Sequence, residues 1–186
     1  MPLSKKNCPC QINPSLATSS NALAYKDCCQ PYHDGFYKDG TDNSAGDQAE
    51  SAERLMRTRY SAFVLVKADY IVATTVPAQQ ALLYINAIEL WAKETDWAGL
   101  EVVQHTPKIG KRHAQVEFKA YYNTEDGLQA HHELSSFVKV TDKTASENKE
   151  RWYFLDPTVS MSVSQKQPCI CGSGEKFKRC CGIFLA

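Results

Sequence analysis

The chain has 186 residues, 43% of them hydrophobic, and its 21 Lys and Arg residues balance its 21 Asp and Glu residues. This length suits one compact domain with small appendages, and the zero net charge is not typical of a protein that binds nucleic acid or anionic membranes. No stretch approaches the roughly 18 apolar residues of a membrane span, so we expect no membrane insertion.

Cysteine usage sets the next expectation. The chain has eight cysteines, an even number that a disulfide framework would also require. The N-terminus, Met1 to Lys6, has no apolar stretch behind it. We therefore expect no secretory signal and a cytoplasmic location, where disulfides are rare. This favours metal ligation, with disulfides or unliganded reduced thiols as the alternatives.

Residues 1–40 contain the first cysteine cluster. Its members form a C-x-C pair and a vicinal pair: Cys8, Cys10, Cys28 and Cys29. The insert from Gln11 to Ala24 separates the pairs, but loop closure costs only about 0.6 kcal/mol per doubling of loop length. We predict a metal site here, with His33 as a reserve ligand and a free or degenerate cluster as the alternative.

A small, polar run from Gly40 to Gly46 is typical of a linker, and the central domain is expected at residues 47–160. Apolar residues then recur on one helical face: Ala52, Leu55, Met56, Tyr60, Phe63 and Val64. They predict an amphipathic helix of about five turns. A second helix is expected from Ala68 to Thr74. Pro77 opens a third helix, whose stripe of core residues is Leu82, Ile85, Ile88 and Ala92.

The period changes to two after Trp97. Apolar residues alternate with polar ones between Ala114 and Tyr122 and again between Leu134 and Val140, with a turn signal in between. A polar loop, Asp142 to Glu150, precedes an aromatic strand, Trp152 to Leu155. Helices followed by antiparallel strands predict an α+β fold with the helices on one face of the sheet.

The polar residues most suited to a site on the sheet are His131, His132, Glu133 and Asp156. On a strand, His131 and Glu133 share one face and His132 points to the other, so all three cannot converge on one substrate. An ion pair of Glu133 with Arg57 or Arg59 is the simpler interpretation. We assign no catalytic residue, and enzymatic activity stays an alternative.

The second cluster lies in residues 166–186 and consists of Cys169, Cys171, Cys180 and Cys181. Four thiolates close a tetrahedral zinc site, although thiolates also accept iron. Gly172 and Gly174 allow the positive φ angles of a tight turn and leave their amides free to bond sulfur. The positive charges of Lys176, Lys178 and Arg179 oppose the negative charge of such a centre.

The stretch PCICGSGEKFKRCCG, residues 168–182, resembles the SEC-C motif found at the end of the SecA translocase motor and on many bacterial proteins. The first cluster is similar to a degenerate copy. The order of helices and strands resembles the cone of nuclear-transport-factor-2-like (cystatin-like) domains. The whole chain, with residues 51–63, is similar to the bacterial YchJ family. The resemblance implies a cone-shaped antiparallel sheet packed on N-terminal helices, flanked by zinc knuckles, and implies no reaction.

The resemblance to the SecA tail favours an adaptor whose C-terminal knuckle docks to a protein partner, in secretion, in chaperone action or at the ribosome. The residues expected to bind the partner are Lys176, Phe177, Lys178 and Arg179. A nucleic-acid-binding knuckle and a small-molecule pocket in the cone are the alternatives. Partner identity and oligomeric state do not follow from the sequence. We also expect metal removal to disorder the tail while the central domain keeps its thermal transition.

Overall fold

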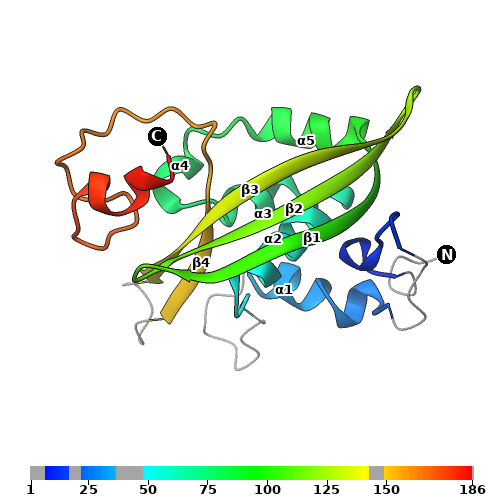
Figure 1. The fold of residues 1–186 in the computed structure, drawn as a ribbon, viewed down its shortest axis with the longest axis horizontal. Helices are drawn as coiled ribbons and strands as arrows, with labels where there is room; N and C mark the ends of the chain where they lie inside the picture. The colour runs from blue at the N-terminus through cyan, green and yellow to red at the C-terminus, as the bar shows by residue number, and fades with distance from the viewer. Residues whose placement is uncertain (1–6, 17–21, 37–47, 143–148, 186) are drawn as a thin grey trace.

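The computed structural model describes residues 7–16, 22–36, 48–142 and 149–185 (Figure 1). The predicted linker at 40–46 and most of the predicted loop at 142–150 lie outside the described residues. None of the helices in the described part of the chain combines the length and apolar character needed to cross a bilayer.

Helices come first along the chain and strands follow, as the α+β prediction requires. The helices are α1 (Gln30–Gly35), α2 (Ala52–Val64), α3 (Ala68–Ala73), α4 (Pro77–Gln80) and α5 (Ile85–Glu94). The strands are β1 (Asp96–Ile109), β2 (His113–Thr124), β3 (Gly127–Asp142) and β4 (Lys149–Leu155). Short 3-10 turns are η2 (Pro9–Gln11), η3 (Tyr25–Asp27), η4 (Phe177–Arg179) and η5 (Cys181–Ile183).

The four strands form one antiparallel sheet in the order β1-β2-β3-β4. Register shifts interrupt the β1–β2 pairing between Trp97 and Gly99, between Val102 and Gln104, and again near its end. Such bulges bend a strand and increase its twist. The long strands accordingly cross in front of α2 and α3, with these helices on one side of the sheet (Figure 1). The predicted fold class is confirmed.

Helix α2 begins at a clear cap. The Ser51 side chain accepts a hydrogen bond from the backbone N–H of Arg54 at 3.0 Å, and Glu53 lies in the first turn, where negative charge is favourable. The helix has 13 residues, so it is shorter than the predicted five turns. It ends because Val66 takes a positive φ of 55°, which turns the chain toward α3.

The predicted third helix is wrong in two respects. The chain leaves helical geometry between α4 and α5, so Pro77 opens only a short helix. The apolar stripe is also not core: Leu82, Ile85 and Trp91 are exposed, and Ala92 is the only buried residue of α5. Leu82 and Trp91 border a cavity, although Trp91 also packs against the rings of Phe63 and Trp97.

Both cysteine clusters pack into the central domain, at opposite ends of the long axis of the molecule (Figure 1). The N-terminal cysteines share a buried cluster with α2 and the sheet, and the C-terminal cysteines share one with Val76, Val138 and Leu155. Gly99 allows close approach of the N-terminal segment, because a Cβ there would lie 2.6 Å from the carbonyl oxygen of Ile12. The C-terminal tail therefore shares a buried cluster with the central domain. This packing favours destabilisation of both parts on metal removal, whereas the sequence predicted disorder of the tail alone.

Candidate metal centres

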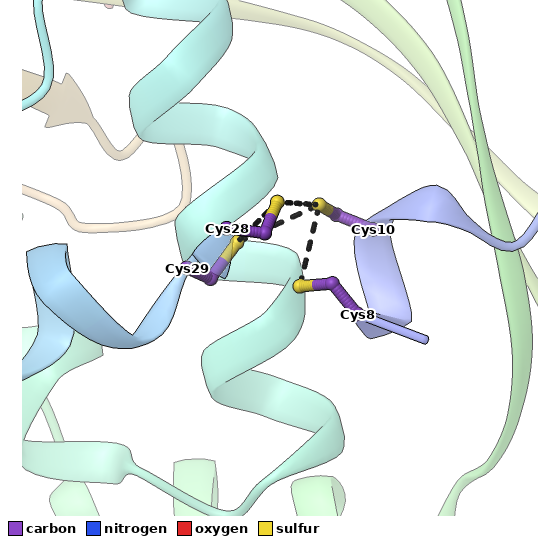
Figure 2. A group of neighbouring side chains, drawn as sticks. All are labelled: Cys8, Cys10, Cys28 and Cys29. Carbon is purple, nitrogen blue, oxygen red and sulfur yellow. Dashed lines mark hydrogen bonds between the residues drawn. The ribbon is translucent and has the colours of Figure 1, made fainter. Parts of the chain in front are cut away.

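The N-terminal cluster is built by two turns that meet beside α2 (Figure 2). Cys8 and Cys10 lie at the start of η2, and Cys28 and Cys29 lie between η3 and α1. A backbone hydrogen bond from the N–H of Cys8 to the carbonyl of Leu23, 2.8 Å long, holds the turns together. All four cysteine side chains are buried.

The sulfur atoms of this cluster have the spacing of a metal site. The Sγ atom of Cys10 lies 3.6 Å from that of Cys8, 3.6 Å from that of Cys28 and 3.5 Å from that of Cys29. A disulfide would need about 2.05 Å. Four sulfurs at about 2.3 Å from a central zinc ion are about 3.8 Å apart along each tetrahedron edge. The donor set and its spacing therefore fit one tetrahedral metal ion.

Side chains of α2 donate hydrogen bonds to these sulfurs. The Ser61 hydroxyl lies 3.3 Å from Cys29 Sγ and 3.5 Å from Cys8 Sγ, and the Nη1 atom of Arg54 lies 3.9 Å from Cys28 Sγ. Donors around thiolate ligands orient them and offset their negative charge. Helix α2 of the central domain thus supplies the surroundings of the N-terminal cluster.

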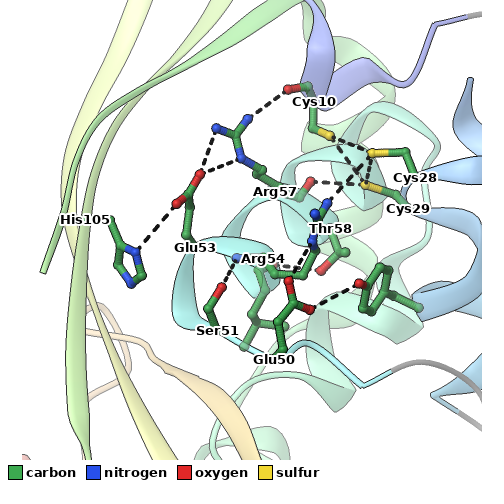
Figure 3. Close-up of polar contacts among 12 residues, drawn as sticks. Cys10, Cys28, Cys29, Glu50, Ser51, Glu53, Arg54, Arg57, Thr58 and His105 are labelled. Atoms are coloured by element: carbon green, nitrogen blue, oxygen red, sulfur yellow. Dashed lines mark hydrogen bonds and ion pairs between the residues drawn. The ribbon is translucent and has the colours of Figure 1, made fainter. Parts of the chain in front are cut away.

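Two arginines are held in place at this site by acidic residues one helical turn earlier (Figure 3). Arg54 pairs with Glu50 at 3.3 Å, and Arg57 pairs with Glu53 at 2.8 Å. The Nη1 atom of Arg57 also donates to the carbonyl oxygen of Cys10 at 3.2 Å. These ion pairs hold both guanidinium groups in place. Arg54 offsets negative charge on the sulfur of Cys28, and Arg57 anchors the η2 turn to α2.

Hydrogen bonds among the four thiols shift their pKa values in different directions. Hydrogen bonds from Cys10 and then Cys29 lower the pKa of Cys28, and the bond to Cys28 raises the pKa of Cys10. The bond from Cys10 is also the main cause that lowers the pKa of Cys8 to about 7. Thiolate is the form that binds metal. Cys28 and Cys8 are therefore the thiols of this cluster that lose their protons most readily.

The C-terminal cluster brings together Cys169, Cys171, Cys180 and Cys181, and all four are buried. The Sγ atoms of Cys171 and Cys180 lie 3.6 Å apart, and every pair in the tetrad lies within 4.8 Å. A hydrogen bond from Cys169 lowers the pKa of Cys171. This tetrad also matches one tetrahedral site.

The turn between the two pairs has the predicted glycine geometry but different hydrogen bonds. Gly172 and Gly174 have φ angles of 72° and 78°. The amide of Gly172 donates to the carbonyl of Cys169 at 3.0 Å, not to sulfur. The sulfur of Cys169 instead accepts from the backbone N–H of Cys181 at 3.4 Å. The glycines therefore shape the turn, and the second cysteine pair supplies the N–H.

His113 is a participant that our sequence reasoning missed. Its Nε2 atom lies 3.4 Å from Cys181 Sγ and 3.9 Å from Cys180 Sγ, although it belongs to β2. Its ring also packs against Phe184, with centroids 4.7 Å apart. The only sequence signal is a histidine at the start of a strand, which does not indicate proximity to cysteines near the C-terminus.

The proposed reserve ligand, His33, does not join the N-terminal cluster. Its Nδ1 atom accepts from the Tyr25 hydroxyl at 2.7 Å, and its Nε2–H donates to the carbonyl of Thr58 at 2.9 Å. Burial lowers its pKa to about 4. Both ring nitrogens are engaged, so this prediction is wrong, and His33 fastens α1 to α2 instead.

The predicted partner-binding residues divide into two groups. Lys176, Lys178 and Arg179 are exposed, and within the described residues none of them bonds a sulfur. Phe177 is buried, and its ring leaves space only for a glycine at position 182. The three cations are exposed to solvent, whereas Phe177 packs inside the knuckle against Gly182.

The polar residues expected on the sheet lie on its two faces, as the strand period of two requires. His131, Glu133 and Asp156 line one cavity, whereas His132 pairs with Glu117 at 2.8 Å away from it. The suggested ion pair of Glu133 with Arg57 or Arg59 is not formed. Glu133 bonds His131 at 2.9 Å and the Ser135 hydroxyl instead. Arg57 pairs with Glu53, and Arg59 bonds the carbonyl of Ile71 through its Nη1 atom alone.

Three family models match the chain. They are described as "YchJ family protein, N-terminal zinc binding domain" over residues 4–37, "YchJ, middle NTF2-like domain" over residues 51–157, and "SEC-C motif" over residues 166–183. The middle model covers more than half of the chain. The matches agree with the metal-binding character of both clusters.

Relatives match over nearly the full length. A "UPF0225 protein" of Actinobacillus succinogenes is 43% identical over 96% of this chain and 97% of its own, and one of Haemophilus influenzae (strain Rd) is 45% identical over 98% and 96%. A crystal structure of a SEC-C motif containing protein from Psychrobacter arcticus has a TM-score of 0.92, 69% identity and 99% coverage of both chains. The solution structure of RPA3114, a SEC-C motif containing protein from Rhodopseudomonas palustris, has a TM-score of 0.58 and 30% identity over 81% of this chain and 96% of its own.

Proposed function

Since this chain belongs to the YchJ protein family, we propose that it is a zinc-stabilised adaptor that docks to a protein partner through its C-terminal knuckle, residues 166–183. One observation carries this proposal: each tetrad is closed by four buried thiols. A catalytic metal site keeps an open position for substrate, and a structural one does not. The metal ions would then stabilise the fold of the docking surface and take no part in a reaction.

Zinc is the metal that this donor set favours. It prefers tetrahedral sites of four thiolates, and the similarity of residues 4–37 to a zinc-binding domain supports the same choice. The test is elemental analysis of protein purified without added metal. We expect one equivalent of zinc per cluster, and a Cys180→Ser/Cys181→Ser variant should lose one of the two. Stoichiometric iron in place of zinc would overturn the assignment.

The surface of the knuckle supports the docking role. Lys178 and Arg179 are exposed side by side, and Ile183 is 63% exposed. Exposed cations and an exposed apolar side chain on one small knuckle suit an acidic protein surface that also offers an apolar contact. The buried Phe177 is not part of this surface, so we expect it to act through the fold of the knuckle.

The docking role is tested by quantitative capture of partners from a lysate of the source organism. Lys178→Ala/Arg179→Ala and Ile183→Ala should each abolish the same captured protein, while the zinc content stays unchanged. Lys93→Ala, which removes an exposed cation of α5, is the matched control and should capture normally. If all variants capture the same proteins in the same amounts, the knuckle is not the docking surface.

A further inference from the structure

A cavity of about 750 Å³ opens between α2, α5 and the sheet. Its wall on α5 includes Ala87, Ile88 and Trp91, and its wall on β2 includes Phe118 and Ala120. The lining is largely apolar, and the volume falls in the range of about 300–1,000 Å³ typical of small-molecule sites. An apolar ligand in the cavity would cover the exposed side chain of Trp91.

A buried cation lines this cavity. Arg59 of α2 is only 8% exposed. Its Nη1 atom donates to the carbonyl of Ile71 at 2.7 Å and to the hydroxyls of Thr74 at 2.7 Å and Thr75 at 3.3 Å. Its guanidinium lies 4.5 Å from the ring centroid of Phe154. Neutral oxygen acceptors therefore hold the Nη1 atom of the guanidinium in place.

The remaining donors of Arg59 have no acceptor among the described residues. Its hydrogen bonds there all use Nη1, and no carboxylate of that part of the chain lies within ion-pairing distance of it. The negative charges of Asp156 and Glu133 favour the charged form of Arg59 but make no direct ion pair with it, and a buried charge without a direct partner is costly. The guanidinium is a planar fork that matches a carboxylate in two parallel hydrogen bonds.

The acidic groups of the same cavity are engaged with other donors. Glu133 accepts from Ser135 and pairs with His131 at 2.9 Å. Asp156 accepts from the backbone N–H of Thr158 at 2.9 Å and from its hydroxyl at 2.6 Å. Their negative charge disfavours a multiply charged anion such as a phosphate ester. A single negative charge on the ligand is the best match to a single guanidinium.

We propose that this cavity binds an amphiphilic monocarboxylate, whose carboxylate pairs with Arg59 and whose aliphatic or aromatic body lies against Trp91 and Phe118. The site is separate from both cysteine clusters, and the proposal does not depend on the adaptor role. Burial lowers the pKa of Arg59 to about 10, which leaves the guanidinium charged at neutral pH.

The test compares three probes that share one alkyl tail and differ in head group: decanoate, decanol and decylamine. Binding to the metal-loaded full chain is followed by tryptophan fluorescence and calorimetry, below the critical micelle concentrations. Because the head-group contact is a charge-assisted hydrogen bond, decanoate should bind about tenfold more tightly than decanol, and decylamine should bind most weakly. Preference for decylamine, or no saturable binding of any probe, would overturn the proposal.

Variants assign the head-group contact. Arg59→Met should reduce decanoate binding to the level of decanol, and Lys93→Met, on the exposed side of α5, should change nothing. Glu133→Gln removes a repulsive charge and should tighten decanoate binding about threefold. Tighter decanoate binding by Glu133→Gln would support a carboxylate site in this cavity even if Arg59→Met fails to fold. Decanoate affinity that ignores the charge at position 133 would contradict a carboxylate site beside Arg59.

Discussion

His113 on β2 places its Nε2 atom 3.4 Å from the Sγ atom of Cys181 in the C-terminal cluster. Burial lowers the pKa of His113, which favours the neutral ring with one N–H to donate. A thiolate ligand of a metal is a good acceptor for that N–H. The sheet therefore holds the C-terminal cluster through a hydrogen bond as well as through apolar packing.

Replacing His113 should weaken metal binding at the C-terminal cluster. His113→Phe keeps a buried ring and removes the donor, and loss of such an outer partner costs about tenfold in metal affinity. We expect faster metal release to a chromogenic chelator. His132→Phe, an exposed histidine of β3, is the control. Equal release from both variants would show that the contact with Cys181 is packing only.

Ser61 should have the corresponding role at the N-terminal cluster. Ser61→Ala removes the hydroxyl 3.3 Å from Cys29 Sγ, and we expect weaker binding there alone, because the two clusters lie at opposite ends of the molecule (Figure 1). Cadmium NMR of the substituted protein separates the clusters. Ser136→Ala, at a buried serine bonded to Gln115, should leave both resonances in place. A change at the C-terminal resonance in Ser61→Ala would contradict this assignment.

Chelation should destabilise the whole molecule rather than the tail alone. Both clusters share buried apolar neighbours with the central domain, and structural zinc contributes on the order of 10 kcal/mol in small zinc modules. Calorimetry before and after treatment with a strong chelator should show a lower transition temperature for the central domain. An unchanged transition would instead support the sequence-based prediction that metal removal disorders the tail while the central domain keeps its thermal transition.

Acid should destabilise the protein through His33. Burial lowers its pKa from 6.5 to about 4, so the unfolded chain binds a proton that the folded protein does not. The stability contribution is complete above about pH 6.5 and falls as the pH drops toward 4, by up to about 3 kcal/mol. Urea unfolding across this window should show a shallower pH dependence for His33→Gln than for the wild type. Acid release of metal is common to both proteins, so parallel curves would exclude this role of His33.

Binding of nucleic acid should be weak. The chain has zero net charge, and the described residues of the knuckle carry only four exposed cations, Lys166, Lys176, Lys178 and Arg179, so we expect affinities worse than roughly micromolar at physiological salt. Fluorescence anisotropy with a single-stranded RNA at several salt concentrations measures this. Submicromolar binding with a steep salt dependence that Lys178→Ala/Arg179→Ala abolishes would make the knuckle a nucleic-acid site.

The sequence by itself determined the features that depend on local spacing. The two cysteine tetrads follow from C-x-C and C-C pairs, the positive φ of Gly172 follows from its turn, and α2 follows from its apolar period. The strand period also separated His131 and Glu133 from His132. In each case the residues concerned lie within a few positions of one another or share one regular element.

Only the tertiary structure decided which distant residues meet. His113 and Cys181 are 68 positions apart and Ser61 and Cys29 are 32 positions apart, and neither contact leaves a trace in local pattern. The same holds for His33, whose ring nitrogens are taken by Tyr25 and Thr58, and for Arg59 at the edge of the cavity. Apolar periodicity shows that one face of α5 avoids water, but it does not distinguish a packed core from a cavity. That distinction depends on the curvature of the sheet and on the volume it leaves beneath α5, which are properties of the assembled fold.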